Sequence, residues 1–351
     1  MTEADLAAAV RFAVKSWMES NSLEDQLHAL ESPNELSRVL GEAVAAKLAE
    51  MNITVDAARA AVLSEPFFHL QDVFDASELP DTPEAFFPLP PCHGSIAGRA
   101  AALAAHGVMG LETISYLTEN EGELFVNLVA MPGDGKEAVK SKDKMRGHTD
   151  GVSLPLRDEL LASANGEDVW SLCAPSPDFV TLIGLRNPES VPTNVMPLGA
   201  VLHGVSLSDI EELKKPQFSV TAQFTFAKGM LAKTGDVQVA IDVPVLVNAA
   251  GGRVVRYSHS NVTPTEDTNH SAHDAIENFQ ASCEQSVVGV TVSPGDVLMV
   301  SNRECLHGRG VVGGEPGGSS RWIVRTYALD TKKLDDNRRH LGKHPRHILK
   351  P

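Results

Sequence analysis

Hydrophobic positions follow a helical period through the first third of the chain. Within residues 1–20 they recur at three- and four-residue steps, which predicts a one-sided helix. The same spacing predicts a second helix from near Pro33 to near Met51. The Ala-rich stretch 100–110 predicts a third helix, which a glycine ends. Residues 64–95 contain many prolines and predict irregular structure.

After residue 110 the pattern changes to short runs that are rich in β-branched residues and separated by Gly, Pro and Asp. Such runs are typical of strands, and many of them in sequence favour a closed or nearly closed antiparallel sheet. Residues 294–296, Pro-Gly-Asp, predict a tight turn, and Asn269 to Ser286 predicts an inserted helix. The predicted strands are 125–129, 179–183, 218–221, 245–247, 288–292, 297–300 and 322–327.

The chain shows no internal repeat and no clear linker, so we expect one catalytic domain over residues 1–351. It would comprise a helical N-terminal layer (1–110), a β core (111–330) and a basic C-terminal tail (331–351). The tail could be a solvated arm, a clamp on the acidic body or a subunit contact. The sequence leaves the oligomeric state open.

Composition narrows the class of protein. A hydrophobic content of 42% is enough for a sizeable core, and the formal net charge of −16 argues against nucleic acid or an anionic membrane as partner. Four cysteines, at 92, 173, 283 and 305, form no CxxC pair. Charged residues within 1–20 argue against a signal peptide, and no hydrophobic run is long enough to span a bilayer. A reducing cytoplasm fits these features.

Candidate chemistry lies in His148-Thr149-Asp150 and in a later His307. On a strand, two-residue spacing would place the first imidazole and the carboxylate on one face. Two histidines and one carboxylate can bind one face of an octahedral metal and leave the opposite face open. The alternative is an exposed His–Asp pair, or a histidine satisfied in a core. Gly308 and Gly310 would allow the backbone to approach the metal, and Arg321 begins the next predicted strand.

The sequence around these residues resembles the clavaminate synthase-like group of Fe(II)/2-oxoglutarate oxygenases, within the taurine-dioxygenase family. The resemblance covers about residues 120–330, and the group includes hydroxylases of free amino acids. It implies an α+β, mainly β fold, a double-stranded β-helix (jelly roll) with a helical N-terminal layer and an inserted helix. The matching segments are Gly147–Asp150, Ser176–Val180, Leu185–Pro188, Val191–Thr193 and Asn302–Arg325.

The resemblance also implies roles for individual residues. His148, Asp150 and His307 would bind Fe(II), and Arg321 would hold the far carboxylate of 2-oxoglutarate, with O2 as the third reactant. Thr193 matches a threonine that helps to hold this cosubstrate, although it could equally be an ordinary turn residue. Related halogenases replace the metal-binding carboxylate with a small residue. Asp150 therefore favours hydroxylation, desaturation or cyclisation over halogenation.

Substrate residues are also suggested by the resemblance. Arg325 matches an arginine that binds the substrate α-carboxylate, but a surface salt bridge is an equal alternative. Relatives that act on arginine or lysine carry acids in the segment that here reads Arg256 to Asn261, where Ser258 and Ser260 stand instead. A buried cation would lack a counter-charge there, so we expect a substrate side chain without positive charge.

Three functional hypotheses follow. The first is an oxygenase that hydroxylates a free amino acid or derivative, and the second is the same enzyme type catalysing desaturation or cyclisation of another small polar acid. The third is a non-catalytic jelly-roll protein that binds metal or 2-oxoglutarate.

Remaining features have simpler interpretations. Residues 151–176 form a long loop, a possible wall or lid of the site, in which Trp170 could be a core anchor. His270 and His273 most simply lie on a solvated helix face, and Cys305 would be buried. Residues 313–318 are rich in glycine and predict a hairpin beside the site, because they lack the Lys-Ser/Thr of a phosphate loop.

Overall fold

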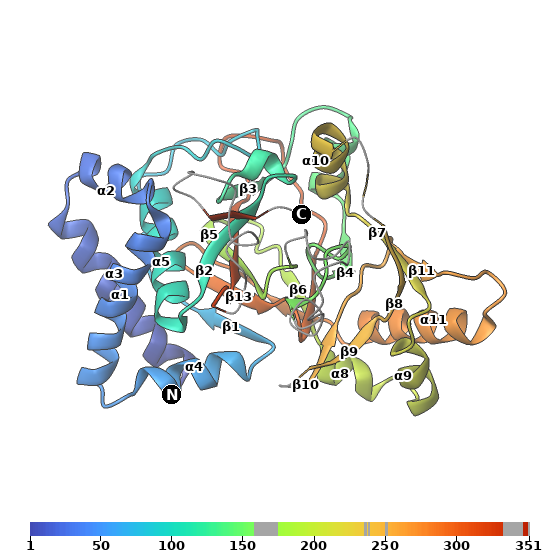
Figure 1. Ribbon diagram of the computed structural model, residues 1–351. Helices are drawn as coiled ribbons and strands as arrows, with labels where there is room; N and C mark the ends of the chain where they lie inside the picture. The colour runs from blue at the N-terminus through green and yellow to red at the C-terminus, as the bar shows by residue number, and fades with distance from the viewer. Residues whose placement is uncertain (158–174, 235–236, 238, 250–251, 333–346, 350–351) are drawn as a thin grey trace.

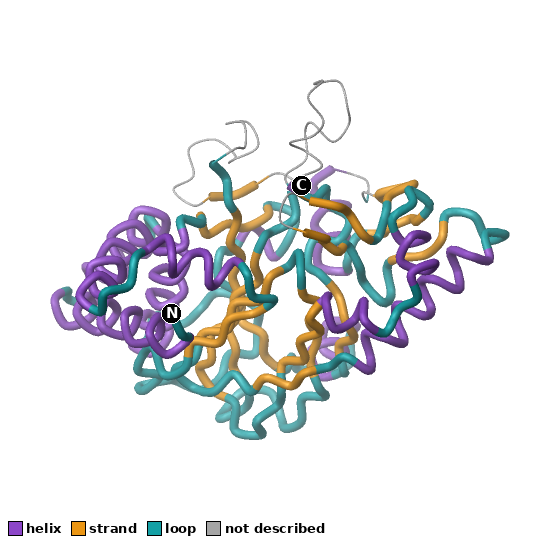
Figure 2. Tube along the Cα trace, turned by 90° about the horizontal axis from the view of Figure 1, so that it is seen from below, coloured by secondary structure: helices purple, strands orange, loops and turns teal. Residues whose placement is uncertain are grey.

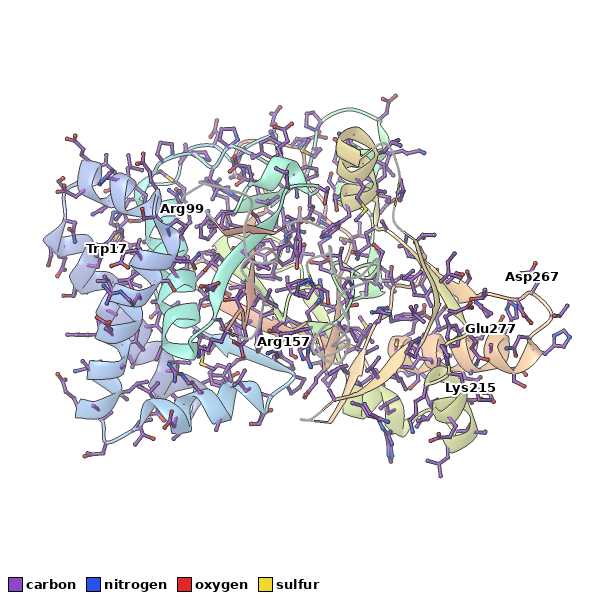
Figure 3. All side chains as sticks on the ribbon, viewed as in Figure 1. Trp17, Arg99, Arg157, Lys215, Asp267 and Glu277 are labelled. Carbon is purple, nitrogen blue, oxygen red and sulfur yellow. The ribbon has the colours of Figure 1, made fainter. Side chains whose placement is uncertain are left out.

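The computed structural model describes residues 1–157, 175–234, 237, 239–249, 252–332 and 347–349. A layer of helices at the N-terminal end lies on one side of the β core, drawn in blue to turquoise in Figure 1. In Figure 3 Trp17 lies within this layer. The helices are α1 (Glu3–Ser20), α2 (Leu23–Leu30), α3 (Pro33–Glu50), α4 (Val55–Leu63) and α5 (His93–Met109).

The two long predicted helices, α1 and α3, are confirmed, and Gly110 ends α5 in a left-handed conformation with φ of 70°. Two short helices were missed, although α2 begins with a capping box formed by Ser22 and Asp25. The proline-rich segment also contains a strand, β1 (Phe67–Leu70), and α5 starts at His93 instead of near residue 100. These local predictions were wrong because β1 lies in the proline-free stretch between Pro66 and Pro80, and the last proline of the segment, Pro91, comes just before α5.

Helices α3 and α5 approach closely through two glycines. A Cβ atom on Gly107 would lie 1.9 Å from the carbonyl oxygen of Ser37, and one on Gly41 would lie 2.6 Å from the Gly107 carbonyl carbon. Only residues without a side chain allow this approach. The same hydrophobic cluster continues from these helices onto the sheet behind them, through residues such as Trp322 and Val324.

The large sheet has seven strands in the order β1-β13-β5-β15-β2-β16, with β3 also paired to β15. All described pairings in it are antiparallel except that of β16 with β2. Since β16 belongs to the C-terminal tail, this part of the tail lies on the sheet edge and is not a solvated arm. The other strands are β2 (Glu112–Tyr116), β3 (Val126–Val129), β5 (Phe179–Arg186), β13 (Val297–Ser301), β15 (Trp322–Leu329) and β16 (His347–Leu349).

The small sheet has four antiparallel strands in the order β12-β6-β14-β4. One face shares a hydrophobic cluster with the large sheet, in which Val195 and Cys305 meet Val180, Ile323 and Tyr327. Side chains alternate along each strand, so the odd-numbered residues of β14 share the face that Cys305 turns to the large sheet. The strands are β4 (Met145–His148), β6 (Thr193–Pro197), β12 (Val288–Val290) and β14 (Cys305–Arg309).

The outer face of the small sheet packs on a second group of helices and strands, which share one hydrophobic cluster with Met196 and Leu306. Figure 2 shows this group on the side of the strands opposite the N-terminal helices. In Figure 3 its outer side carries Lys215, Asp267 and Glu277, all of them exposed. The elements are α8 (Leu198–His203), α9 (Leu207–Leu213), β7 (Phe218–Thr221), β8 (Val239–Val243), β9 (Leu246–Ala249), β10 (Gly252–Val255), β11 (Val262–Pro264) and α11 (His270–Gln285).

Three short helical elements complete the described chain: η1 (Asn120–Gly122), α6 (Lys136–Lys142) and α10 (Phe224–Thr234). The inserted helix predicted at 269–286 is confirmed as α11. None of the helices in the described ranges is both long and apolar enough to cross a membrane.

His106 joins α5 to the large sheet. Its Nδ1 lies 2.8 Å from the Thr113 hydroxyl and its Nε2 lies 2.8 Å from the Thr181 hydroxyl. Complete burial lowers the pKa of His106 to about 3. The unfolded chain would bind a proton here below pH about 6.5, whereas the folded chain stays neutral until about pH 3. Stability is therefore fully present above pH 6.5 and is lost as the pH falls from 6.5 towards 3.

We expect His106→Gln to remove this part of the pH dependence, which is worth at most about 5 kcal/mol at roughly 1.4 kcal/mol per pH unit. Urea unfolding of the parent and the variant between pH 4 and pH 8 measures it. His203→Gln, at an exposed position, is the matched control and should keep the parental slope. A His106→Gln variant with the parental slope would contradict this assignment.

Candidate metal centre

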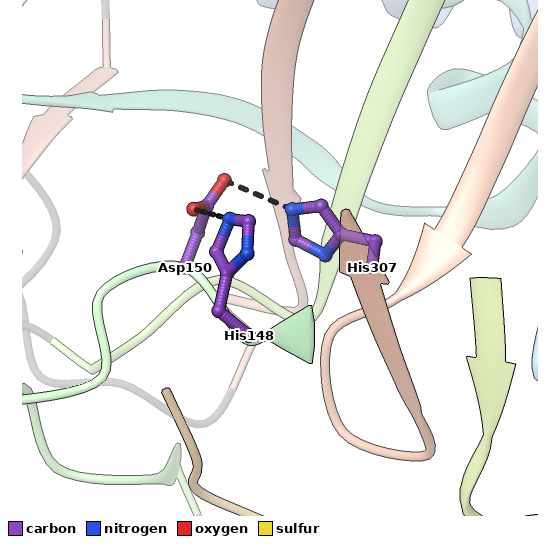
Figure 4. Close-up of side chains that lie close together, drawn as sticks. All are labelled: His148, Asp150 and His307. Atoms are coloured by element: carbon purple, nitrogen blue, oxygen red, sulfur yellow. Dashed lines mark ion pairs between the residues drawn. The ribbon is translucent and has the colours of Figure 1, made fainter. Parts of the chain in front are cut away.

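The two sheet histidines face each other across neighbouring strands. His307 in β14 is the register partner of His148 at the end of β4. Strand β4 ends at His148, so Asp150 lies in the following turn and not on the strand. The expectation that strand alternation aligns His148 and Asp150 was therefore wrong, and the turn brings the carboxylate back towards both rings (Figure 4).

The three side chains lie close enough to share one ion. Asp150 Oδ1 is 3.5 Å from His148 Nε2, and Asp150 Oδ2 is 3.6 Å from His307 Nε2. One ligand atom from each residue lies within 4.8 Å of the others, and no other His/Cys/Asp/Glu group in the described part of the chain meets this criterion. Bonds of about 2.1 Å to one metal would place adjacent ligand atoms about 3 Å apart, and both Asp150–His distances are close to that value.

The pKa shifts of His307 and Asp150 favour metal binding, whereas that of His148 favours its protonated form until a metal replaces the proton. His148 Nδ1 donates to the Arg146 carbonyl at 2.9 Å, which leaves Nε2 to face Asp150. Burial lowers the pKa of His307, and the neighbouring His148 lowers it further. Burial opposes ionisation of Asp150, but contacts with His148, His307 and Arg325 outweigh it and hold the pKa of this carboxyl well below its usual range. In His148, burial is outweighed by Asp150 and the Arg146 carbonyl, and the pKa is raised.

A second charged group adjoins the carboxylate. Arg325 Nη2 lies 2.8 Å from Glu119 Oε1, and Arg325 Nη1 lies 3.9 Å from Asp150 Oδ2. The Tyr327 hydroxyl is 3.1 Å from Asp150 Oδ2 and 3.3 Å from Glu119 Oε1. Arg325 is only 11% exposed, so its salt bridge is buried and not on the surface. Burial raises the pKa of Glu119, although Arg325 opposes this shift.

Two buried guanidinium groups form a cationic cluster next to His307. Arg309 lies two residues beyond His307 on β14, a step of about 7 Å along a strand, and is the register partner of Thr193 on β6. Thr193 is thus a buried strand residue and not a turn residue. Burial, together with the nearby charge of Arg309, lowers the pKa of Arg321 to about 9. Burial lowers the pKa of Arg309 to about 10, although the charge of Asp143 opposes this shift.

Some hydrogen-bond donors of the cationic cluster have no acceptor within the protein. Arg321 Nη1 donates to the Leu128 carbonyl at 3.4 Å, and Arg309 Nη2 donates to the carbonyls of Lys140 and Asp143 at 3.1 and 2.8 Å. The Nε atoms of Arg309 and Arg321 have no hydrogen-bond partner, and no carboxylate among the described residues forms an ion pair with either. Asp143 partly offsets the charge of Arg309, but Arg321 is shifted only by burial and by Arg309. A buried charge is costly without a counter-charge, so Arg321 fits an anionic ligand.

The predicted substrate serines are separated by the structure. Ser258 is buried and forms a β-bridge with His148, whereas Ser260 is exposed. The Ser258 hydroxyl donates to the Asn261 side chain at 2.9 Å. Gly308 was expected to let the backbone approach a metal, but it lets β14 approach β4 instead. A Cβ atom at this position would lie 2.4 Å from the Met145 carbonyl oxygen of β4. The predictions for Trp170 and for most of the loop 151–176 lie outside the described residues.

The sequence analysis missed three residues that lie beside the triad or the cationic cluster. Glu119, Tyr327 and Arg309 were not predicted, although Tyr327 lies two residues beyond Arg325 and strand alternation could have indicated it. Cys305 is fully buried, as predicted. His270 is exposed at the start of α11 and His273 is half-buried.

No family model matches the chain. It is 25% identical over 246 residues to the L-asparagine oxygenase of Streptomyces coelicolor, an alignment that covers 69% of this chain and 66% of that protein. It is 22% identical over 223 residues to the L-lysine 3-hydroxylase of Catenulispora acidiphila, covering 62% of this chain and 54% of that protein. The chain is a homologue of these amino-acid oxygenases. The matched segments span less than two thirds of either relative's own length.

Solved structures of such oxygenases share the fold. Asparagine oxygenase in complex with Fe(II), 2S,3S-3-hydroxyasparagine and succinate matches 92% of this chain and 96% of its own, with a TM-score of 0.68 and 20% identity. The non-haem iron oxygenase OrfP in complex with Fe, succinate and (3S)-hydroxy-L-Arg matches 98% and 97%, with a TM-score of 0.71 and 19% identity. The resemblance predicted from the sequence is confirmed, as is a mixed fold of helices and antiparallel sheets.

Proposed function

We propose that this chain is an Fe(II)- and 2-oxoglutarate-dependent oxygenase that hydroxylates an unactivated C–H bond of a free amino acid or amino-acid derivative. The observation that carries the proposal is the convergence of His148, Asp150 and His307 beside the buried cationic cluster. Two imidazoles and one carboxylate are the ligand set of non-haem Fe(II) oxygenases. The L-asparagine oxygenase and L-lysine 3-hydroxylase among the relatives support the same reaction class.

His148, Asp150 and His307 would hold Fe(II). When bound, the iron would couple the oxidative decarboxylation of 2-oxoglutarate, which consumes O2, to oxidation of the substrate. The far carboxylate of 2-oxoglutarate would accept hydrogen bonds from Arg321, with Thr193 beside it. Arg309 adds a second positive charge at the same place. A guanidinium can hold a carboxylate through two parallel hydrogen bonds, which orients the cosubstrate as well as binding it.

The Arg325–Glu119 pair would recognise the amino-acid backbone. A free amino acid carries a carboxylate and an ammonium group on one carbon, and this pair offers one group of each opposite charge within 2.8 Å of one another. Arg325 also lies 3.9 Å from Asp150, so a substrate held here would lie beside the metal-binding carboxylate. Recognition at both ends of the zwitterion would favour free amino acids over acids that lack the amino group.

A substrate side chain without positive charge fits the segment next to His148. Ser258 is bridged to His148, and Ser258 and Asn261 bind each other through neutral groups. Burying an ammonium or guanidinium group against them would leave it without a counter-charge. Ser258 remains the better candidate of the two predicted serines for contact with the substrate, because Ser260 is exposed.

We also infer that the large and small sheets form the double-stranded β-helix expected of this oxygenase group. Their facing strands share one hydrophobic cluster, and the metal-binding histidines lie on facing positions within the small sheet. The N-terminal helices share a cluster with the large sheet, which supports a single catalytic domain over residues 1–351 with a helical layer at 1–110.

Succinate release and product mass test the proposal. Anaerobic protein with Fe(II) and 2-oxoglutarate should show a weak visible charge-transfer band, and aerobic incubation with the true substrate should accelerate succinate formation. In a panel of free amino acids, hydroxylation adds the mass of one oxygen, whereas desaturation or cyclisation removes two hydrogens. Protein that binds Fe(II) but gives neither band nor succinate would be a binding protein and would overturn the proposal.

The cosubstrate affinity should depend on the charge of Arg321. Burial lowers the pKa of Arg321, but the guanidinium keeps its charge at neutral pH and can pair with the far carboxylate of 2-oxoglutarate. We therefore expect the Kd for 2-oxoglutarate to be constant from pH 7 to pH 8. Arg321→Met should raise it by roughly 30- to 4,000-fold at pH 7.5, since breaking a buried charge pair costs about 2–5 kcal/mol.

Anaerobic titration of the charge-transfer band measures this Kd. Arg253→Met, at an exposed position on β10, is the control and should bind 2-oxoglutarate like the parent. Parental affinity in Arg321→Met would assign the far carboxylate to another cation.

A further inference from the structure

The metal-binding carboxylate stands on a turn that two carboxamide side chains hold. After the end of β4, Thr149 donates its backbone N–H to the Tyr257 carbonyl at 2.8 Å, and Asp150 is the next residue. Asn302 Oδ1 accepts the backbone N–H of Asp150 at 2.8 Å, and Asn302 Nδ2 donates to the backbone carbonyl of Asp150 at 2.9 Å. Asn302 thus bonds both backbone groups of this one residue, as a neighbouring strand would.

The flanking peptide groups are held by Gln223. Its Oε1 accepts the N–H of Gly151 at 2.9 Å, and its Nε2 donates to the carbonyl of Thr149 at 3.0 Å. The two carboxamides therefore bind four backbone groups in three consecutive residues. We call Asn302 and Gln223 the carboxamide clamp. Gly151 has φ of 65°, a left-handed conformation that the clamp on its N–H helps to fix.

Each member of the clamp is itself anchored to a different part of the fold. Asn302 is 1% exposed, follows β13 and also donates to the Pro177 carbonyl at 3.0 Å. Gln223 lies between β7 and α10, where the backbone N–H of Ala227 donates to the Gln223 carbonyl at 2.8 Å. Two residues after Gln223, the Thr225 hydroxyl donates to the Glu119 carboxylate at 3.2 Å. The turn is therefore positioned by segments more than seventy residues away in sequence.

We propose that Asn302 and Gln223 are positioning residues which fix the Asp150 carboxylate for metal binding. This inference rests on the proposed function, because it requires that the triad binds a metal. A carboxamide offers an acceptor and two donors in a fixed plane, so it can restrain both sides of a peptide group. Functional groups must be held within about 0.5 Å of their working geometry, and a turn without such partners would let the carboxylate move further.

Gln223→Met is the main test, because methionine keeps the length of the side chain and Gln223 is half-buried, so the freed peptide groups can reach water. We expect the Kd of the apo protein for Co(II) to rise about 10- to 100-fold, the usual effect of removing a group that orients a metal ligand. The visible Co(II) spectrum should change with the ligand geometry. The melting temperature of the apo protein should change little. If Gln223 served only the stability of the fold, the melting temperature would fall and the Co(II) affinity of the folded protein would not.

Gln217→Met is the matched control, since the Gln217 carboxamide binds Glu212 on α9 and Asn269, away from the triad. It should leave the Co(II) affinity and spectrum unchanged. Asn302→Asp, which keeps the acceptor for the Asp150 N–H but loses both donors, should alter the spectrum in folded protein. Parental Kd and spectrum in folded Gln223→Met would overturn the clamp. Failure of the parent to bind Co(II) would instead overturn the proposed function together with the clamp.

Discussion

Asp150→Ala is expected to abolish hydroxylation. Removing a group that only orients a metal ligand costs about 10- to 100-fold, so removing the ligand itself should cost more than a hundred-fold. Asp150 also supplies the negative charge that faces His148, His307 and Arg325, and its loss leaves three basic groups around the metal position. Metal affinity and product formation should therefore fall together. Product mass under saturating Fe(II) and 2-oxoglutarate, with a Co(II) titration of the apo protein, measures both.

Asp134→Ala removes an exposed carboxylate and should retain parental metal affinity and turnover. Hydroxylation retained in Asp150→Ala would show that the metal, if bound, uses other ligands. Loss of turnover with unchanged Co(II) affinity would place Asp150 in a later step than metal binding.

The triad was predictable from the sequence, but the geometry behind it was not. His148, Asp150 and His307 could be proposed from their motifs, while the reason given for the first two was partly wrong. The strand stops at His148, and the backbone N–H groups of Asp150 and Gly151 in the turn after it donate to Asn302 and Gln223. Such contacts join segments far apart in sequence, and no local periodicity reports them.

Strand prediction failed for the two strands that carry the histidines. The strands β13 and β15 were predicted because they are apolar runs with β-branched residues, and α11 was predicted as a helix between strands. Strands β4 and β14 read Met-Arg-Gly-His and Cys-Leu-His-Gly-Arg, which combine charged residues, histidine and glycine. Strand preference depends strongly on tertiary context, and here pairing within the small sheet forms strands that local propensity does not favour.

Glu119 shows a different limit of the sequence. It lies in a short acidic stretch with Glu121 and Glu123, and nothing local separates the three. In the structure Glu119 is buried against Arg325, while Glu121 is exposed. Its importance appears only when β15 brings Arg325 and Tyr327 to it from more than two hundred residues away.

The Arg325–Glu119 pair leads to the second large expected effect. Arg325→Met should lower kcat/KM for the amino acid by roughly 30- to 4,000-fold, corresponding to about 2–5 kcal/mol for a buried charged contact with the substrate. It should also lower the free energy of unfolding by about 3–5 kcal/mol, because Glu119 is left buried without its partner. Substrate-independent succinate formation should persist, since the residues proposed to bind the metal and 2-oxoglutarate are intact.

The double variant Glu119→Gln/Arg325→Met separates recognition from stability. Replacing both members of a buried ion pair with neutral groups of similar size is often close to neutral for folding, so much of the lost stability should return. Hydroxylation of the amino acid should not return, because neither end of the zwitterion has a counter-charge. Arg38→Met, which breaks an exposed pair with Glu35 at 2.6 Å, is the control and should change neither property appreciably. If the double variant regained parental kcat/KM, the pair would serve folding alone and the amino-acid backbone would be bound elsewhere.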